Sequence, residues 1–257
     1  MANEVLVHYE SGVMEIRLNR PEKMNAVTTA MTEQILAAVH EAQLDDLVRC
    51  LLISANGKAF CSGRDLSSAT PGESASDILS KEMNPIIMAL YSLSKPTVAS
   101  VQGVALGFGL GLALACDVVH ASRSARFGIP FSKLGAALDC GCHWLLRQRI
   151  SSGKIMELIY SAENLDGTAA ASLGLIERCW PDDELYESTL KFAQICANGP
   201  ALAFAQQKDL LRRSLDWTLE QVLEAESKLQ GELSITPDYR EGIQAFQERR
   251  PAVFRKY

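Results

Sequence analysis

Residues 95–122 read KPTVASVQGVALGFGLGLALACDVVHAS, and this stretch decides the fold class. The apolar run over 97–101 follows Lys95-Pro96 and predicts a short strand. Glycines crowd residues 103–111, which predicts a tight loop that opens a helix. A further strand is expected over 117–121. The succession of strand, glycine loop, helix and strand is typical of an α/β fold.

The same alternation extends toward the N-terminus. Apolar and charged residues alternate over 14–18 and predict a half-buried strand. Thr28 or Thr29 can cap a following helix, and residues 50–53 predict a second, buried strand. Residues 67–76 are rich in Ser, Pro and Gly, which predicts a mobile loop before a helix that ends near Leu93.

The second half is predicted to be mostly helical. Helices are expected over 144–149, 154–161 and 165–173, a short strand over 175–179, and only helices from Pro181 onward. An apolar stripe on one of these helices comprises Leu219, Val222, Leu223 and Leu229, and Thr236-Pro237 predicts the start of the last helix. We therefore expect a core domain over 1–195 and a helical part over 196–257 that serves oligomerisation and completes the pocket.

Composition excludes several classes of protein. The 257 residues are 47% hydrophobic and 22% charged, as in ordinary globular proteins. A formal net charge of −6 disfavours nucleic-acid binding, and no apolar run is long enough to span a membrane. The first residues do not resemble a secretory signal, and seven scattered cysteines favour reduced thiols. The sequence therefore predicts a cytoplasmic protein with no nucleic-acid or membrane partner.

Two glycine turns could carry chemistry. They are KAFCSGRDL at 58–66 and the loop at 103–111. Backbone N–H groups from two such turns can converge on one oxygen and form an oxyanion hole, which suits a thioester that becomes an enolate. Glycine-rich turns are also common structural features, and the second one lacks the spacing of a dinucleotide-binding fingerprint.

A lone acid follows in the segment GAALDCGCH at 135–143. Asp139 lies in an apolar context, which would raise its pKa and make it a proton acceptor at neutral pH. It could equally cap the helix that contains Trp144. A metal site is disfavoured because Cys140 and Cys142 form the only close cysteine pair, and no second ligand cluster accompanies them.

Taken in order, these segments resemble the crotonase (enoyl-CoA hydratase/isomerase) superfamily over nearly the whole chain. The matching segments are NRPEKMNA at 19–26, KAFCSGRDL at 58–66, the stretch at 95–122, ARFGIPFSKLG at 125–135, GTAAASLGLIERCWP at 167–181 and EGIQAFQERRPAVF at 241–254. The resemblance implies a spiral of repeated ββα units with a C-terminal helical trimerisation part. It also implies a homotrimer or a dimer of trimers.

The resemblance further implies a coenzyme A thioester as substrate, so that no separate cofactor is needed. The oxyanion hole would be formed by the backbone N–H groups of Arg64 and Phe108. The residues expected to bind CoA are Lys23, Met24, Ala26, Phe60, Ser62, Gly63, Asp65 and Leu66. The Arg64 side chain would be free to reach a phosphate or to point into solvent.

The departures from the family pattern bear on the reaction. Gly111 and Phe131 stand where hydratases carry their two glutamates. Asp139 instead matches the acid of the enoyl-CoA Δ3,Δ2-isomerases and of the ring-epoxide isomerases that act on phenylacetyl-CoA. Its neighbour Leu138 replaces a usual Pro, and Cys142 replaces a usual Gly. An apolar acyl pocket is expected from Phe131, Leu134, Leu138 and Cys140.

The resemblance therefore favours an isomerase in which Asp139 moves a proton of an enolate held in the oxyanion hole. Three alternatives stay open. A hydratase would recruit another acid, such as Glu157 or Asp65. A dehalogenase or hydrolase would use Asp139 as a nucleophile. A non-catalytic scaffold would only bind CoA esters or RNA.

Overall fold

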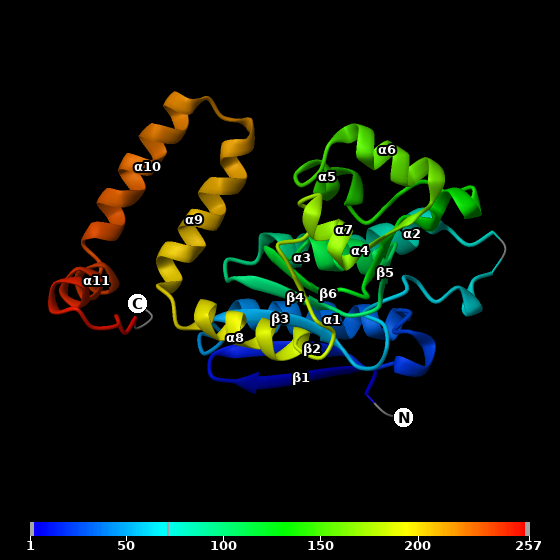
Figure 1. Cartoon of the computed structure of the whole chain (residues 1–257), viewed down its shortest axis with the longest axis horizontal. Coiled ribbons are helices and arrows are strands. Elements are labelled where there is room, and N and C mark those ends of the chain that lie inside the picture. Colours follow the sequence, from blue (N-terminus) through cyan, green and yellow to red (C-terminus); the bar gives the residue numbers. More distant parts are fainter. Residues whose placement is uncertain (1–2, 71, 255–257) are drawn as a thin grey trace.

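The computed structural model describes residues 3–70 and 72–254 and contains two sheets (Figure 1). The strands are β1 (Val5–Glu10), β2 (Val13–Leu18), β3 (Cys50–Ala55), β4 (Thr97–Val101), β5 (Val104–Leu106), β6 (Val118–Ser122), β7 (Arg126–Gly128), β8 (Asn164–Asp166) and β9 (Arg178–Trp180). The large sheet has the order β1-β2-β3-β4-β6-β9 and is parallel apart from β1, which pairs antiparallel with β2. The small sheet has the order β5-β7-β8.

Helices pack on both faces of the large sheet. The helices of the described chain are α1 (Thr29–Leu44), α2 (Ala75–Ile78), α3 (Asn84–Ser92), α4 (Phe108–Leu114), α5 (Cys142–Arg147), α6 (Ser152–Ser161), α7 (Gly167–Ser172), α8 (Leu185–Ala197), α9 (Ala201–Arg213), α10 (Leu219–Ser234) and α11 (Pro237–Glu248). Leu51 and Ile53 of β3 point into the main core, whereas Cys50 and Leu52 pack under α8. This period of two explains why the central strands are apolar throughout.

The chain advances in turns that each contain two strands and a helix. β4 of the large sheet leads to β5 of the small sheet and then to α4. Cys61 bridges to Ala105 of β5, so the turn after β3 stacks directly on the turn after β4. The predicted spiral of repeated ββα units is therefore confirmed.

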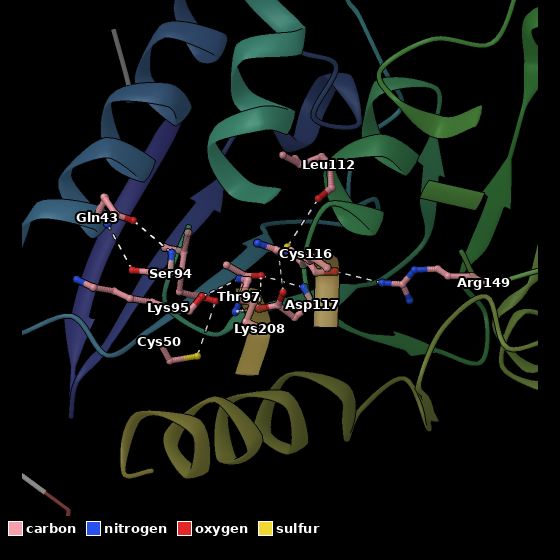
Figure 2. A network of polar contacts seen from close by, with 12 residues as sticks. Gln43, Cys50, Ser94, Lys95, Thr97, Leu112, Cys116, Asp117, Arg149 and Lys208 are labelled. Carbon is pink, nitrogen blue, oxygen red and sulfur yellow. Dashed lines mark hydrogen bonds and ion pairs between the residues drawn. The ribbon is translucent and has the colours of Figure 1, made fainter. Parts of the chain in front are cut away.

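The three last helices form an arm that stands away from the core (Figure 1). Its first helix, α9, is anchored by Lys208, whose Nζ lies 2.6 Å from Asp117 Oδ2 and donates to the Lys95 carbonyl at 2.9 Å (Figure 2). Thr97 donates its N–H to the same carboxylate at 2.9 Å. The expected domain boundary at 195/196 falls inside α8, which packs on the sheet, and the arm begins only at α9.

Several short elements differ from the expectations. β5, β7 and β8 each have three residues, too few for a periodic pattern, and β8 with α7 replaces the single helix expected over 165–173. The loop expected over 67–76 includes a 3-10 turn, Leu66–Ser68, and the start of α2. A five-residue π-helix, Leu79–Met83, then joins α2 to α3. Thr28 caps α1 and Thr236 caps α11, as predicted.

Candidate active site

A cavity of about 270 Å³ opens where the two glycine turns meet the segment that carries Asp139. The first turn contributes Ser62, Gly63, Arg64 and Leu66. The second contributes Gly107 and Phe108, and a covering segment contributes Ala75, Ile78, Leu79 and Met83. The remaining wall is formed by Pro130, Phe131, Leu134, Ala136 and Asp139. Apart from Arg64 and Asp139, these side chains carry no charge.

Two residues of the cavity wall have backbone N–H groups without an acceptor in the described part of the chain. Gly63 has φ of +104° and Gly107 has φ of +52°, values that favour glycine, and each precedes a cavity residue. The N–H groups of those residues, Arg64 and Phe108, donate to no protein acceptor in the described part of the chain. Phe108 also begins α4, so its N–H lies at the positive end of that helix.

The backbone around these turns is tightly fixed. Cys61 donates its N–H to the Val104 carbonyl and accepts from Leu106 N–H, each at 3.0 Å. A Cβ at Gly109 would lie 2.3 Å from the Cys61 carbonyl oxygen. Only a glycine allows the two turns to approach this closely, and their approach brings both free N–H groups to one cavity.

Asp139 is half-buried in the opposite wall. Burial raises the pKa of its carboxyl group, while the Cys140 thiol and His143 act in the opposite direction. The N-cap residue of α5 is Gly141, and no side chain caps that helix. The capping role considered for Asp139 is therefore wrong, and the residue instead lines the cavity.

Gly111 and Phe131 stand at the two positions where glutamates would be expected in a hydratase. A Cβ at Gly111 would lie 2.9 Å from the Cys140 carbonyl oxygen and 3.0 Å from Cys140 Cβ, so the Asp139–Cys140 turn fills that space. Phe131 packs its ring over Gly107, at 3.5 Å from the position of a Cβ. Gly111 therefore has no room for a larger side chain, and position 131 contributes an apolar ring to the cavity wall.

The sequence suggested that the Arg64 side chain would reach a phosphate or point into solvent. In the structure it does neither, because it pairs with Glu73. Its guanidinium holds both oxygens of Glu73, with Nη2 2.9 Å from Oε2. Glu73 precedes α2 in the segment that covers the cavity. The ion pair therefore ties this cover to the residue that supplies one of the two N–H groups.

Three of the eight residues expected to bind CoA line the cavity. Ser62, Gly63 and Leu66 line it, and Ser62 donates its N–H to the carbonyl of Met24, an exposed residue. Exposed Lys23 and half-buried Ala26 flank Met24 and do not line the cavity.

Two of the expected CoA residues are engaged elsewhere. Phe60 is fully buried in the core, so it cannot line a CoA site. Asp65 accepts hydrogen bonds from the hydroxyl and N–H groups of Ser67 and pairs with Arg20, whose Nη1 lies 2.6 Å from Oδ2. These contacts hold the pKa of its carboxyl well below the usual range.

Two of the four residues expected to form an acyl pocket line this cavity. Phe131 and Leu134 line the cavity, but Leu138 and Cys140 are buried in the core behind it, because the turn at Asp139 directs them inward. The residues of the cover were not expected at the site from the sequence; they are Ala75, Ile78, Leu79 and Met83. Their apolar spacing was visible in the sequence, but nothing in it showed which side of that segment faces a ligand.

The other acids considered for hydration lie elsewhere. Glu157 is exposed on α6, where its Oε2 lies 2.7 Å from Lys154 Nζ. In the described residues, no group of three or more His, Cys, Asp or Glu could hold a metal ion. None of the helices over 3–70 and 72–254 is long and apolar enough to cross a membrane.

This fold places the two glycine turns and Asp139 around one cavity. The sequence pattern of the enoyl-CoA hydratase/isomerase family matches residues 8–257. A probable enoyl-CoA hydratase of Rhodobacter capsulatus is 38% identical over 251 residues, which are 96% of this chain and 97% of that one. The 1,2-epoxyphenylacetyl-CoA isomerase of Escherichia coli is 34% identical over 259 residues, 99% of both chains.

A solved structure agrees with these sequence matches. The crystal structure of an enoyl-CoA hydratase/isomerase homologue from Mycobacterium abscessus superposes with a TM-score of 0.94 at 31% identity, over 98% of this chain and 100% of that one. The chain belongs to the enoyl-CoA hydratase/isomerase family of enzymes, and thus to the crotonase superfamily.

Proposed function

We propose that this protein is an acyl-CoA isomerase that shifts a double bond, or rearranges a ring, through an enolate. The observation that carries the proposal is that Asp139 is the only carboxylate among the described residues of the cavity wall. A 1,3-shift of a proton needs one group that takes the proton at one carbon and returns it at another. Hydration would need a second group to activate water.

The thioester oxygen would accept hydrogen bonds from the N–H groups of Arg64 and Phe108. Asp139 would remove a proton near the carbonyl carbon, and the negative charge would move onto that oxygen. The two N–H groups bind the enolate more strongly than the neutral thioester, so they accelerate the reaction rather than only hold the substrate. Asp139 then returns the proton further along the acyl chain.

The raised pKa of Asp139 supports this role, because a more basic carboxylate is a better acceptor for a carbon-bound proton. Phe131 and Leu134 would exclude water and suit a fatty or aromatic acyl group. The exposed ends of the cavity near Met24 and Lys23 would take the CoA part. No other cofactor is needed, since CoA belongs to the substrate.

We also propose a homotrimer or a dimer of trimers in the cytoplasm. The arm carries large apolar side chains that are exposed in the single chain, including Leu219, Leu223 and Phe246. Such a face is stabilised when a second copy covers it, and a neighbouring arm could complete the pocket. Seven free cysteines suit a reducing compartment.

The test is product analysis with purified protein. We would offer a 3-enoyl-CoA and a 2-enoyl-CoA, in parallel, to the wild type, to Asp139→Asn and to the control Glu157→Gln. The proposal expects conversion of the 3-enoyl to the 2-enoyl ester by wild type and control, not by Asp139→Asn. Formation of a 3-hydroxyacyl-CoA by the wild type would instead establish a hydratase.

Two other outcomes would also contradict the proposal. An acyl adduct on Asp139, found by mass spectrometry, would make the residue a nucleophile. Tight binding of both esters without any turnover would indicate a scaffold.

A further inference from the structure

The cavity has an open rim and a buried floor. Leu66 and Leu134 are 55% and 63% exposed and form part of the rim, whereas Met83 is only 4% exposed. The cavity volume of about 270 Å³ lies just below the range of about 300–1,000 Å³ that is typical of sites for drug-sized ligands. It therefore has room for an acyl group and its thioester, but not for the CoA part. A chain that enters from the rim ends at Met83.

A π-helical turn places Met83 at this floor. The Asn84 N–H donates to the Leu79 carbonyl, five residues earlier, whereas the bonds of an α-helix span four residues. In an α-helix, side chains five residues apart point roughly 140° away from each other. The wider turn instead brings Ile78 and Met83 to the same cavity. Such turns are rare and are frequent at functional sites.

The core begins directly behind Met83. Its Sδ atom lies 3.9 Å from Sγ of Cys140, which is buried in the main core cluster. Met83 thus separates the cavity from the core with an unbranched side chain, which has three rotatable bonds and adapts to irregular gaps. This side chain can be shortened without changing the glycine turns at 58–66 and 103–111.

We propose that Met83 is a specificity-determining residue that limits the length of an unbranched acyl chain in this cavity. With the thioester oxygen at the N–H groups of Arg64 and Phe108, the chain would extend inward and end against Met83. Each methylene group that leaves water for the apolar cavity tightens binding by about fourfold. Carbons beyond this limit would have to displace Met83, so they add little. The inference rests on the proposed function, which makes an acyl-CoA the ligand.

Two substitutions shorten the floor by different amounts. Met83→Ala removes Cγ, Sδ and Cε, which leaves room for about three further methylene groups. Met83→Val ends two atoms closer to the backbone than methionine, which leaves room for about two. Leu134→Ala is the matched control, because it truncates an apolar side chain at the rim. It should weaken binding of all chain lengths by a similar factor and leave the limit where it is.

The experiment measures the Kd of saturated acyl-CoA esters by calorimetry, from butyryl-CoA to dodecanoyl-CoA in steps of one carbon. The wild type should gain about fourfold in affinity per carbon up to a limiting length, and nothing beyond it. The limit should move to longer chains in Met83→Ala, by a smaller step in Met83→Val, and not at all in Leu134→Ala. Circular dichroism checks that each variant is folded.

Three results would overturn the inference. They are a wild type without any limiting length, a limit that stays in place in Met83→Ala, and an equal shift of the limit in Leu134→Ala. If Met83→Ala does not fold, Met83→Val decides alone: a limit at longer chains supports the inference, and an unchanged limit overturns it.

Binding needs no turnover, so the measurement separates this inference from the proposed function. If the limit moves as expected but the wild type does not isomerise a 3-enoyl-CoA, Met83 sets the chain length and the proposed reaction fails. If the wild type isomerises that ester but the limit does not move, only the inference on Met83 fails. If no ester binds to the wild type, both fail.

Discussion

The two walls of the cavity are built in opposite ways. One wall presents two backbone N–H groups, at Arg64 and Phe108, on turns that are locked together by buried backbone hydrogen bonds. The other presents one side chain, Asp139, at the end of the exposed segment 132–137. In the proposed mechanism, the first wall binds the thioester through its backbone, whichever side chains it carries. The single acid of the second wall then decides which reaction occurs.

The largest expected effect is on the wall that carries the acid. Asp139→Asn keeps the size of the side chain but removes its basicity, so kcat for isomerisation should fall about 10²- to 10⁴-fold. Binding of a saturated acyl-CoA, measured by calorimetry, should change little, because both N–H groups remain. A kcat within tenfold of wild type would show that the reaction does not depend on the Asp139 carboxylate.

The next effect tests the backbone wall. Gly107→Ala places a Cβ at φ of +52°, so the turn must shift and the Phe108 N–H loses its direction. Loss of one such donor costs about 100-fold or more in kcat. Gly153→Ala is the matched control, because nothing lies within 4 Å of its Cβ position. Equal rates for the two variants would contradict a role for the Phe108 N–H.

A third prediction tests the contact between the walls. Gly111→Ala inserts a methyl group 2.9 Å from the Cys140 carbonyl oxygen. Overpacking of this kind typically costs about 1–3 kcal/mol, so the free energy of unfolding in urea should fall by that amount. Gly231→Ala on α10 has open space around it and should cost nothing. If both variants are equally stable, the turn at Asp139–Cys140 can shift at little cost in free energy and is not held in place by α4.

The smallest effect concerns the cover of the cavity. Glu73→Gln breaks the ion pair with Arg64, so the cover should open more often and KM should rise about two- to fivefold, with kcat nearly unchanged. The wild-type KM should rise with added salt, and that of the variant should respond less. Asp77→Asn removes the exposed pair with Lys81 on the same cover and serves as the control. A changed kcat with constant KM would place Glu73 in the chemistry instead.

The same comparison explains how far the sequence could predict the site. The glycine turns at 58–66 and 103–111 predicted the first wall, because positive φ and close approach leave few residue types other than glycine. Asp139 was found from its apolar context in the segment 135–143 and from its match to the acid of the isomerases. Whether its side chain faced a ligand or capped α5 could not be decided, since both need an acid at the same position.

Contacts between distant segments were beyond prediction. The pairing of Arg64 with Glu73 depends on how residues 67–76 fold back, and that part of the chain has no periodic pattern. Leu138 and Phe60 were expected to line the site, but the turn geometry and the sheet direct them into the core. Apolar residues next to a site belong equally well to its wall or to the core behind it, and only the backbone path distinguishes the two.

The most direct test of the account is deuterium exchange beside the thioester carbonyl. A saturated acyl-CoA would be incubated in heavy water with wild type or Asp139→Asn, and the α-carbon followed by proton NMR and mass spectrometry. We predict exchange with the wild type and none above background with Asp139→Asn, although both bind the ester. No exchange with bound wild type, or equal exchange with both proteins, would contradict an enolate formed by Asp139.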